Sequence, residues 1–352
     1  MDRVVNGRFL TQPTTGVQRY AGAIAESLTT LDPSIVVVSP RKLTAESNAT
    51  TLHPRKVGLF GGYAWEQLEL PMFLRCRRRR PILLSLANMA PLSYDRNVVT
   101  IHDVAFLRHP EWYSRAFRLT YRFFIPRIAR LALKVITDSE FSRREILELL
   151  GVPESRIEVI PCAATPASGG ETVSGANPYG RYVLGVSSLA PSKNLKGLVE
   201  SFRLLADSDL KLVVVGKRHR AFGAIGIDTE SPGAESIVFT GHVSDRELAT
   251  LYHHAEVFVY PSFYEGFGMP PLEAMTAGCP VVVSNAASLP EVCGDAAVYV
   301  DPARPGEIAD AIRNVLSDRA LREDLIARGK AQAERFDWPT SAGAVLDVLS
   351  RL

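Results

Sequence analysis

Cysteine is scarce in this chain of 352 residues, and its spacing fits neither a metal site nor a disulfide framework. The four cysteines are Cys76, Cys162, Cys279 and Cys293, and no two of them form a Cys-x-x-Cys pair. A zinc site and a small disulfide-stapled fold are therefore both disfavoured. We expect reduced thiols in a cytoplasmic protein.

Long hydrophobic runs and an excess of one charge are also missing. No stretch approaches the roughly 18 apolar residues of a membrane-spanning helix. The first residues lack the apolar centre of a secretory signal. The formal net charge is only +2, which predicts no nucleic-acid partner. We expect a protein that is soluble or lies on a membrane surface.

The glycine-rich phosphate loops of two common nucleotide-binding classes are absent as well. Neither half of the chain has a G-x-G-x-x-G motif after its first apolar strand, and there is no P-loop. A nicotinamide-dependent dehydrogenase is therefore poorly supported. His253 and His254 lack partners at metal-ligand spacing and are expected on a helix surface.

What the sequence does contain is a long alternation of apolar strands and amphipathic helices. With 46% apolar residues, the chain is long enough for two domains that each bury a core. Near-continuous Val, Ile and Leu strands separated by helices indicate parallel sheets covered on both faces. The predicted strands are Val4–Leu10, Ile35–Ser39, Ile82–Leu86, Val98–Ile101, Val135–Thr137 and Ile157–Ile160, then Val183–Ser187, Leu212–Val215, Ile237–Thr240, Val257–Tyr260, Val281–Ser284 and Ala297–Val300.

A segment of small and polar residues, Cys162–Gly180, separates the two halves and is predicted to be a linker. Trp338-Pro339 interrupts the helical pattern near the end, and a last helix is expected over Ala342–Leu349. Arg41–Gly62 shows little periodicity and is predicted to be loop. The expected domains are residues 1–168, residues 177–336, and a terminal helix within 337–352 that packs back on the first domain. A cleft is expected between the carboxyl ends of the two sheets.

The stretch Tyr260–Asn285 carries the most specific signal. Gly266 and Gly268 follow a predicted strand, and Pro270-Pro271 precede a predicted helix. A glycine loop that leads into a helix N-terminus suits a phosphate group. Glu265 and Glu273 bracket this loop, with Glu273 expected in the first helical turn. The alternative is a surface loop in which Glu273 only complements the helix dipole.

Polar residues that follow other predicted strands are further candidates. His102, with Asp103, follows Val98–Ile101 and is placed to bind a substrate hydroxyl or phosphate, although a turn histidine bonded to backbone is the alternative. Lys193 follows Val183–Ser187, and a cation there can neutralise a diphosphate. Lys217 and Arg218 follow Leu212–Val215, where a solvated loop is the competing interpretation.

Together these residues resemble the signature of the family 4 retaining glycosyltransferases. The resemblance covers nearly the whole chain in family order and is most specific in the block Glu265–Met275. It is also carried by Gly16–Tyr20, His102-Asp103, Thr137–Ser142, Lys193-Asn194 and Leu289–Val292. It implies the α/β GT-B architecture, with two Rossmann-like, doubly wound parallel-sheet domains and an interdomain cleft. It also implies metal-independent transfer of a hexose from a nucleotide diphosphate sugar, with retained anomeric configuration.

The resemblance implies roles for individual residues of this chain. Glu265 would contact hydroxyls of the donor sugar, and Glu273 would accept from the ribose hydroxyls. Lys193 would bind the diphosphate, and His102 would face the donor sugar and the acceptor. The remaining implied contacts to the donor are Gly16, Gly266, Phe267, Gly268 and Leu272.

The chain departs from the family pattern beside the lysine. Ser188 stands where many members have arginine, and Ser192 precedes Lys193. Phosphate binding would then rest on Lys193, with Arg218 as a substitute. No permanently bound cofactor is expected. A non-catalytic partner subunit of another transferase and a nucleotide-sugar epimerase remain as alternative functions.

The subgroup that the sequence resembles is that of bacterial exopolysaccharide and O-antigen transferases, often mannosyltransferases. GDP-mannose is therefore the preferred donor and UDP-glucose the alternative, with a glycan or lipid-linked glycan as acceptor. Arg75, Arg77–Arg80 and a series of arginines in Trp112–Val135 lie among aromatics. Such a basic surface suits peripheral binding to anionic lipid at the inner face of the cell membrane. A solvated helix face is the alternative, and Pro126 is expected to interrupt this helix.

Overall fold

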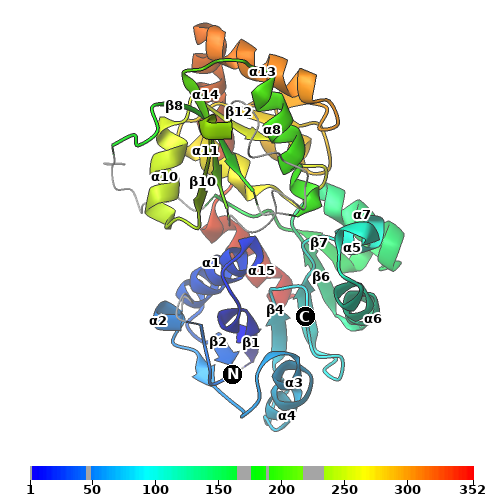
Figure 1. Ribbon diagram of the computed structural model, residues 1–352. Coiled ribbons are helices and arrows are strands. Elements are labelled where there is room, and N and C mark those ends of the chain that lie inside the picture. The colour runs from blue at the N-terminus through cyan, green and yellow to red at the C-terminus, as the bar shows by residue number, and fades with distance from the viewer. Residues whose placement is uncertain (1, 45–48, 165–175, 188–189, 217–233) are drawn as a thin grey trace. The chain divides into compact units, whose positions relative to one another are not determined.

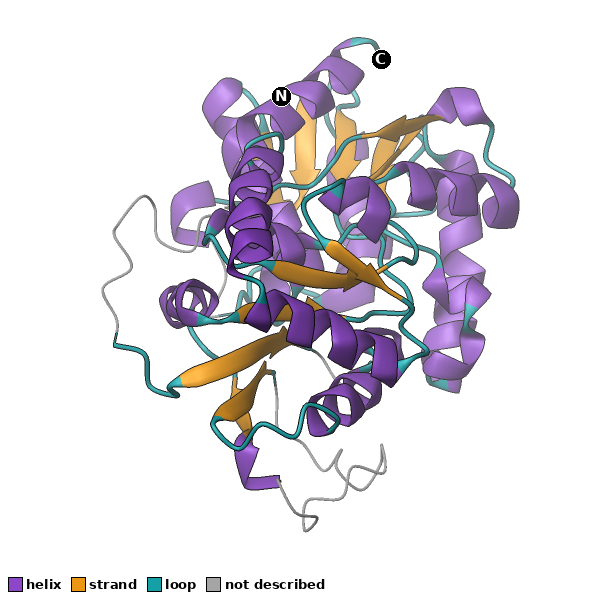
Figure 2. Cartoon of the chain, turned by 90° about the horizontal axis from the view of Figure 1, so that it is seen from above, coloured by secondary structure: helices purple, strands orange, loops and turns teal. Residues whose placement is uncertain are grey.

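The structure is a computed structural model that describes residues 2–44, 49–164, 176–187, 190–216 and 234–352. The chain forms two compact units (Figure 1). Unit 1 consists of Met1–Cys162 and Asp337–Leu352, and unit 2 of Ala163–Phe336. Each unit contains one parallel sheet, and helices lie alongside the strands (Figure 2). Most of the predicted linker lies outside the described residues.

The sheet of unit 1 has seven strands in the order β3-β2-β1-β4-β5-β6-β7. All its neighbouring strands run parallel. The order reverses between β1 and β4, because β1 has β2 on one side and β4 on the other. The strands are β1 (Arg3–Asn6), β2 (Val36–Ser39), β3 (Arg55–Lys56), β4 (Ile82–Ser85), β5 (Asn97–Thr100), β6 (Lys134–Thr137) and β7 (Ile157–Val159).

The sheet of unit 2 has six parallel strands in the order β10-β9-β8-β11-β12-β13. Its order reverses between β8 and β11. Open α/β sheets bind ligands at such a switch point, outside the carboxyl ends of the strands. The strands are β8 (Arg181–Val186), β9 (Leu210–Val215), β10 (Ile237–Gly241), β11 (Val257–Tyr260), β12 (Val281–Ser284) and β13 (Val298–Val300).

The helices fill the connections between these parallel strands. In unit 1 they are α1 (Gly16–Leu31), α2 (Ala49–Leu52), α3 (Gly62–Ala64), α4 (Leu70–Arg75), α5 (Ala105–Arg108), α6 (Arg115–Leu131), α7 (Glu140–Leu150) and α15 (Trp338–Ser350). In unit 2 they are α8 (Leu195–Arg203), α10 (Asp245–His254), α11 (Met269–Thr276), α12 (Leu289–Cys293), α13 (Pro305–Ser317) and α14 (Arg319–Ala333). The last helix, α15, packs against α1.

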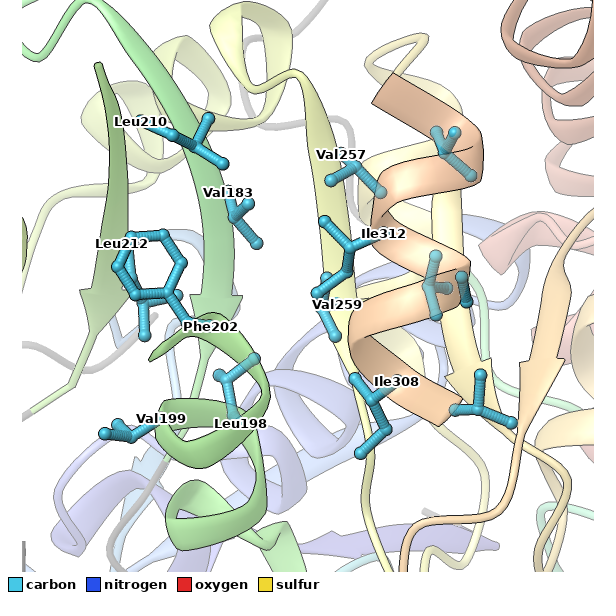
Figure 3. Close-up of a cluster of buried hydrophobic side chains, with 14 of the residues drawn as sticks. Val183, Leu198, Val199, Phe202, Leu210, Leu212, Val257, Val259, Ile308 and Ile312 are labelled. Carbon is cyan, nitrogen blue, oxygen red and sulfur yellow. The ribbon is translucent and has the colours of Figure 1, made fainter. Parts of the chain in front are cut away.

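Each unit buries its own hydrophobic core between sheet and helices. In unit 2, Val183 and Val259 from the strands pack against Phe202 of α8 and Ile312 of α13 (Figure 3). In unit 1, one cluster joins β5 and β6 to α6 and α7, and a second surrounds the fully buried Trp65. These cores fix the carboxyl ends of the strands, where the candidate site residues lie.

The first predicted strand ends earlier than its apolar residues suggest. The strand stops at Asn6, and Gly7–Thr11 forms a 3-10 helix instead of extending to Leu10. The Asn6 side chain accepts a hydrogen bond from the Arg8 amide at 3.2 Å and so begins the turn. A Cβ on Gly7 would lie 2.7 Å from the Val38 carbonyl oxygen, so only glycine fits there.

Three further predictions from the sequence were wrong. Arg41–Gly62 is not all loop, because it contains α2 and the edge strand β3, whose two basic residues show no apolar pattern. Pro126 does not interrupt α6, which continues to Leu131. The final helix begins at Trp338 and not at Ala342, because Asp337 caps it and Pro339 lies in its first turn.

Candidate functional site

Lys193, Glu265 and Tyr260 meet at the switch point of unit 2. Lys193 ends the short 3-10 helix Pro191–Lys193 after β8, while Tyr260 ends β11 and Glu265 lies in the loop beyond it. The lysine Nζ lies 2.7 Å from each carboxylate oxygen of Glu265 and 3.0 Å from the Tyr260 hydroxyl. The Phe263 amide also donates to the Ser192 carbonyl at 2.7 Å, which ties the two loops together.

The lysine in this cluster is held in its charged form. Burial alone would lower the pKa of Lys193, but the Glu265 carboxylate and the Tyr260 oxygen outweigh burial and raise it. Burial, with the charge of Glu265, likewise raises the pKa of the Tyr260 hydroxyl. The site therefore combines a fixed cation, a carboxylate that is only 9% exposed and a neutral phenol.

The loop after Glu265 is shaped by residues of a neighbouring segment. The Ser288 hydroxyl donates to the carbonyl oxygens of Glu265 and Phe267, at 3.0 and 2.7 Å. Gly268 has a φ of +105°, and a Cβ there would lie 2.6 Å from Leu289 Cδ2. Ser288 and Leu289 thus hold this loop in place.

Backbone N–H groups of the same loop are available to a ligand. The amides of Phe267, Gly268 and Met269 donate to no atom of the part of the chain that the structure describes. Helix α11 begins at Met269, and its next two residues are prolines that carry no N–H. The available donors therefore lie in the glycine loop and at the first residue of the helix. Consecutive unpaired amides at a helix start suit an anion.

Glu273 lies one turn later than the sequence predicted. Because α11 starts at Met269, Glu273 is its fifth residue, and no acidic residue occupies the first turn. The Tyr252 hydroxyl on α10 donates to Glu273 Oε2 at 3.1 Å and fixes the carboxylate. Glu273 remains partly exposed, so its carboxylate can also accept from a ligand.

His102 lies in unit 1, after β5, and is only 6% exposed. Its Nδ1 is 2.6 Å from Asp138 Oδ2, and its Nε2 is 3.1 Å from the Leu86 carbonyl oxygen. Both partners accept hydrogen bonds, so the ring satisfies both as an imidazolium. Burial lowers the pKa of His102, but the Asp138 carboxylate outweighs it and raises this pKa overall. A substrate that bonds His102 must replace one of these two protein partners.

The remaining predicted residues fall into three groups. Gly16 begins α1 in unit 1, and its backbone is exposed. Leu272 is fully buried and Phe267 is 6% exposed, so they can offer little more than backbone to a ligand. Ser188 and Arg218, named above for phosphate binding, lie outside the described residues.

Sequence reasoning missed the residues that orient the site. Tyr260, Tyr252 and Ser288 each bond a predicted site residue or its loop, yet none belongs to a recognisable spacing. From the sequence pattern, Tyr260 and Tyr252 were indistinguishable from ordinary core residues of a strand and a helix. The direct contact between Lys193 and Glu265 was also missed, since 72 residues separate them.

The described residues offer neither a metal site nor a membrane-spanning helix. They contain no group of three or more His, Cys, Asp or Glu side chains arranged to hold a metal ion. Among the described helices, none combines the length and the apolarity needed to cross a membrane.

Comparison with known proteins identifies the family. The family "Glycosyltransferase Family 4" matches residues 14–167, and "Glycosyl transferases group 1" matches residues 172–332. The O-antigen chain mannosyltransferase B of Escherichia coli is 36% identical over 261 residues, which are 70% of this chain and 68% of that protein. The serotype-specific mannosyltransferase WbdA of Escherichia coli is 28% identical over 276 residues; the match covers 73% of this chain and about a third (34%) of that protein.

Solved structures agree on the fold. Anabaena Alr3699/HepE in complex with UDP-glucose superposes with a TM-score of 0.77 at 18% identity, covering 99% of each chain. WaaG, a glycosyltransferase involved in lipopolysaccharide biosynthesis, gives a TM-score of 0.74 at 16% identity, also over 99% of each chain. With its two parallel-sheet units and the two matched families, this chain belongs to the family 4 glycosyltransferases and has the GT-B fold.

Proposed function

We propose that the chain is a retaining, metal-independent hexosyltransferase that moves mannose from GDP-mannose to a growing, lipid-linked polysaccharide. The observation that carries this proposal is the cluster at the switch point of unit 2. There a fixed lysine, a buried carboxylate and unpaired loop amides lie on adjacent loops. These are the groups needed for a sugar attached to a diphosphate.

Each group has a separate task in the proposed reaction. Lys193 and the loop amides stabilise the negative charge that develops on the leaving diphosphate, which is the role that a metal ion plays elsewhere. Glu265 accepts hydrogen bonds from hydroxyls of the donor sugar while it orients Lys193. Glu273, held by Tyr252, accepts from the ribose. Unit 2 is thus the donor domain.

Unit 1 is then the acceptor domain. His102 lies just beyond the carboxyl end of β5. It takes part when a sugar hydroxyl displaces the Leu86 carbonyl from Nε2. The pair with Asp138 raises the pKa of His102 and fixes the orientation of its ring. In the same proposal Gly16 leaves room for the diphosphate near the start of α1.

The choice of mannose rests on the relatives. O-antigen chain mannosyltransferase B and RfbU are both named for mannose transfer to an O-antigen chain. UDP-glucose is the competing donor, because HepE has been solved in complex with it. An epimerase would isomerise the donor without an acceptor, and a non-catalytic partner would bind nucleotide without transfer.

A thermal-shift panel of GDP, UDP, ADP and their sugars tests this assignment. A ligand that binds only the native state raises the unfolding temperature. We expect GDP and GDP-mannose to give the largest shifts, and transfer assays with that donor to yield an α-linked product by NMR. No shift with any nucleotide contradicts the proposed function, and a β-linked product contradicts retention.

We also propose that the protein works in the cytoplasm, bound peripherally to the inner membrane face. Helix α6 contains five arginines and no acid, and its exposed side chains include Leu119 (71% exposed) and Phe123 (49%). Leu119 and Phe123 are four residues apart and therefore share one helix face with neighbouring arginines. Apolar and basic groups side by side suit anionic lipid. Within the basic run Arg75–Arg80, by contrast, Arg80 pairs with Asp95 and Arg77 stacks on Phe73.

A further inference from the structure

Unit 1 has its own switch point, between β1 and β4. The first residues after β1, at the start of the connection that leads to Gly16, have no role in the reaction proposed above. Arg8 is the second residue after β1 and lies in the 3-10 helix Gly7–Thr11. Its position relative to the sheet is therefore that of a ligand-binding residue in an open α/β fold. The surroundings of Arg8 show what it could bind.

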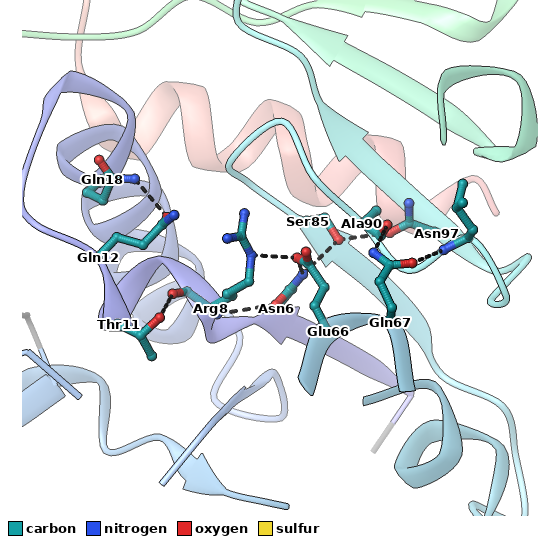
Figure 4. Close-up of polar contacts among 11 residues, drawn as sticks. Asn6, Arg8, Thr11, Gln12, Gln18, Glu66, Gln67, Ser85, Ala90 and Asn97 are labelled. Atoms are coloured by element: carbon teal, nitrogen blue, oxygen red, sulfur yellow. Dashed lines mark hydrogen bonds and ion pairs between the residues drawn. The ribbon is translucent and has the colours of Figure 1, made fainter. Parts of the chain in front are cut away.

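The guanidinium of Arg8 is buried and held in one orientation. Arg8 is 5% exposed, and its Nε lies 2.9 Å from Glu66 Oε1 (Figure 4). Asn6 Nδ2 donates to the same carboxylate oxygen at 2.7 Å, and Asn6 Oδ1 accepts from the Arg8 amide. Glu66 itself is 1% exposed and lies in a π-helical turn, Trp65–Glu69. Such turns are frequent at functional sites.

The remaining donors of this arginine are unused. Its two terminal nitrogens form no hydrogen bond with any residue in the described ranges, and Figure 4 shows them directed away from Glu66. The atoms of this pair that are buried without a hydrogen-bond partner among those residues are Arg8 Nε and Glu66 Oε2. The two terminal nitrogens are not buried in this way, so a guanidinium held beside a buried carboxylate can donate both of them to a ligand.

Aromatic rings adjoin the guanidinium. Arg8 Cζ lies 4.9 Å from the centre of the Tyr63 ring, which is 41% exposed and stacks on Phe124 at 6.2 Å. Tyr121 is close by, because Tyr63, Arg8 and the acids Asp103 and Glu66 all act on its hydroxyl. The neighbourhood thus offers an exposed ring face next to oriented N–H donors.

The charge of this neighbourhood selects the class of ligand. The charge of Arg8 is already paired with that of Glu66, so Arg8 offers hydrogen bonds without a net positive charge, and an anionic ligand is disfavoured. A neutral sugar fits, since its hydroxyls accept from a guanidinium and its C–H face packs on an aromatic ring. We propose that Arg8 and Tyr63 bind a neutral hexose unit of the acceptor glycan. This inference rests on the proposed function.

Saturation-transfer NMR on the full chain tests this, with methyl α-mannopyranoside as neutral probe and mannose 1-phosphate as anionic probe. The variants are Tyr63→Ala, which changes a half-exposed side chain, and the double substitution Arg8→Gln with Glu66→Gln, which removes both buried charges together. Arg41→Gln, an exposed arginine of the same unit, is the matched control. Unfolding temperatures verify that each variant is folded.

We expect the neutral probe to bind the wild type and the control equally, and both site variants at least about tenfold more weakly. Nucleotide binding should be unchanged in all of them. Equal binding by the site variants, tighter binding of mannose 1-phosphate, or no sugar binding by a nucleotide-competent wild type overturns the inference. Loss of all nucleotide binding in the wild type instead contradicts the proposed function, so the two failures are distinguishable.

Discussion

At the scale of single residues, the account depends on Lys193 and Glu265 acting as one unit. Their side chains are 23% and 10% exposed, so both charges have lost much of their contact with water. Each charge compensates the other. Removing one partner leaves a largely buried charge without compensation, whereas removing both does not. Coupling of this kind is measurable, because the stability losses caused by substituting two interacting residues do not add up.

The pair predicts a specific double-mutant cycle. Lys193→Met and Glu265→Gln are each expected to lower the free energy of unfolding by about 1–3 kcal/mol. The double variant should lose clearly less than the sum, as measured by urea unfolding. Strictly additive losses would show that the 2.7 Å contacts contribute no coupling in solution.

The His102–Asp138 pair predicts a pH dependence of stability. Its raised pKa means that the charged ring is stabilised in the folded protein. That contribution is complete below the unfolded value near 6.5 and is lost as the pH rises through the higher folded value. His102→Gln should remove this part of the pH dependence, and an NMR titration of the ring reports the folded pKa directly. Identical pH profiles for both proteins would contradict the prediction.

At this scale the sequence supplied the chemical groups but not their contacts. Glu265 and Lys193 were identifiable because each follows an apolar strand or belongs to a specific motif. Their pairing was not, since it depends on which strands are neighbours in the sheet. Arg8 was taken for part of a strand because it stands within an apolar run, although it lies in the 3-10 helix Gly7–Thr11 and faces Glu66.

At the scale of elements, the site depends on the loop between β11 and α11. Gly268 has to be glycine, because its φ is +105° and Leu289 occupies the space of a Cβ. Ser288 also holds the loop through hydrogen bonds to two of its carbonyl oxygens. Its backbone amides can therefore face a ligand without rearrangement, which is the preorganisation that stabilises charge in a transition state.

Gly268→Ala is expected to destabilise unit 2 by about 1–3 kcal/mol through backbone strain and the clash with Leu289. It should also weaken nucleotide binding by displacing the amides. Gly306→Ala is the matched control, because Gly306 is helical and has open space around its Cβ position. There alanine should be neutral or slightly stabilising. Equal effects of the two substitutions on unfolding temperature would contradict this account of the loop.

The elements themselves were largely predictable from apolar periodicity, and the failures have physical causes. Edge strand β3 consists of Arg55–Lys56 and buries nothing, so no hydrophobic signal marks it. Helix α6 continues through Pro126 because Ile125, Ile128 and Ala129 are buried in the core of unit 1. That packing outweighs the cost of a proline in a helix, about 3 kcal/mol.

At the scale of the whole molecule, both units place polar residues at the point where the strand order reverses. Lys193 and Glu265 follow β8 and β11 in unit 2, and Arg8 follows β1 in unit 1. The parallel sheets were predictable from the strand composition. The strand order was not predictable, because it depends on the side of the first strand to which each connection adds the next strand. The positions of the switch points therefore came from the structure.

Membrane association belongs to this scale, and liposome flotation measures it. The variant replaces Arg115, Arg122 and Arg130 of α6 with serine, and the control replaces three exposed arginines of unit 2, Arg304, Arg313 and Arg319. Each basic residue near an anionic surface contributes about 1 kcal/mol, so the α6 variant should bind roughly a hundredfold more weakly. Binding should need anionic lipid and fall with salt. Equal recovery of variant and control would exclude α6 as the contact surface.

The central claim is that unit 2 binds a nucleoside diphosphate sugar at the Lys193, Glu265 and Glu273 site. Calorimetric titration of the full chain with GDP and UDP, in wild type, Glu273→Ala and the exposed control Glu323→Gln, tests it most directly. The account predicts that the control equals the wild type, with GDP bound more tightly than UDP. Glu273→Ala should lose about ten- to a hundredfold in affinity, the value of one charged hydrogen-bond pair. Unchanged affinity in Glu273→Ala, or no binding of either nucleotide by the wild type, would contradict it.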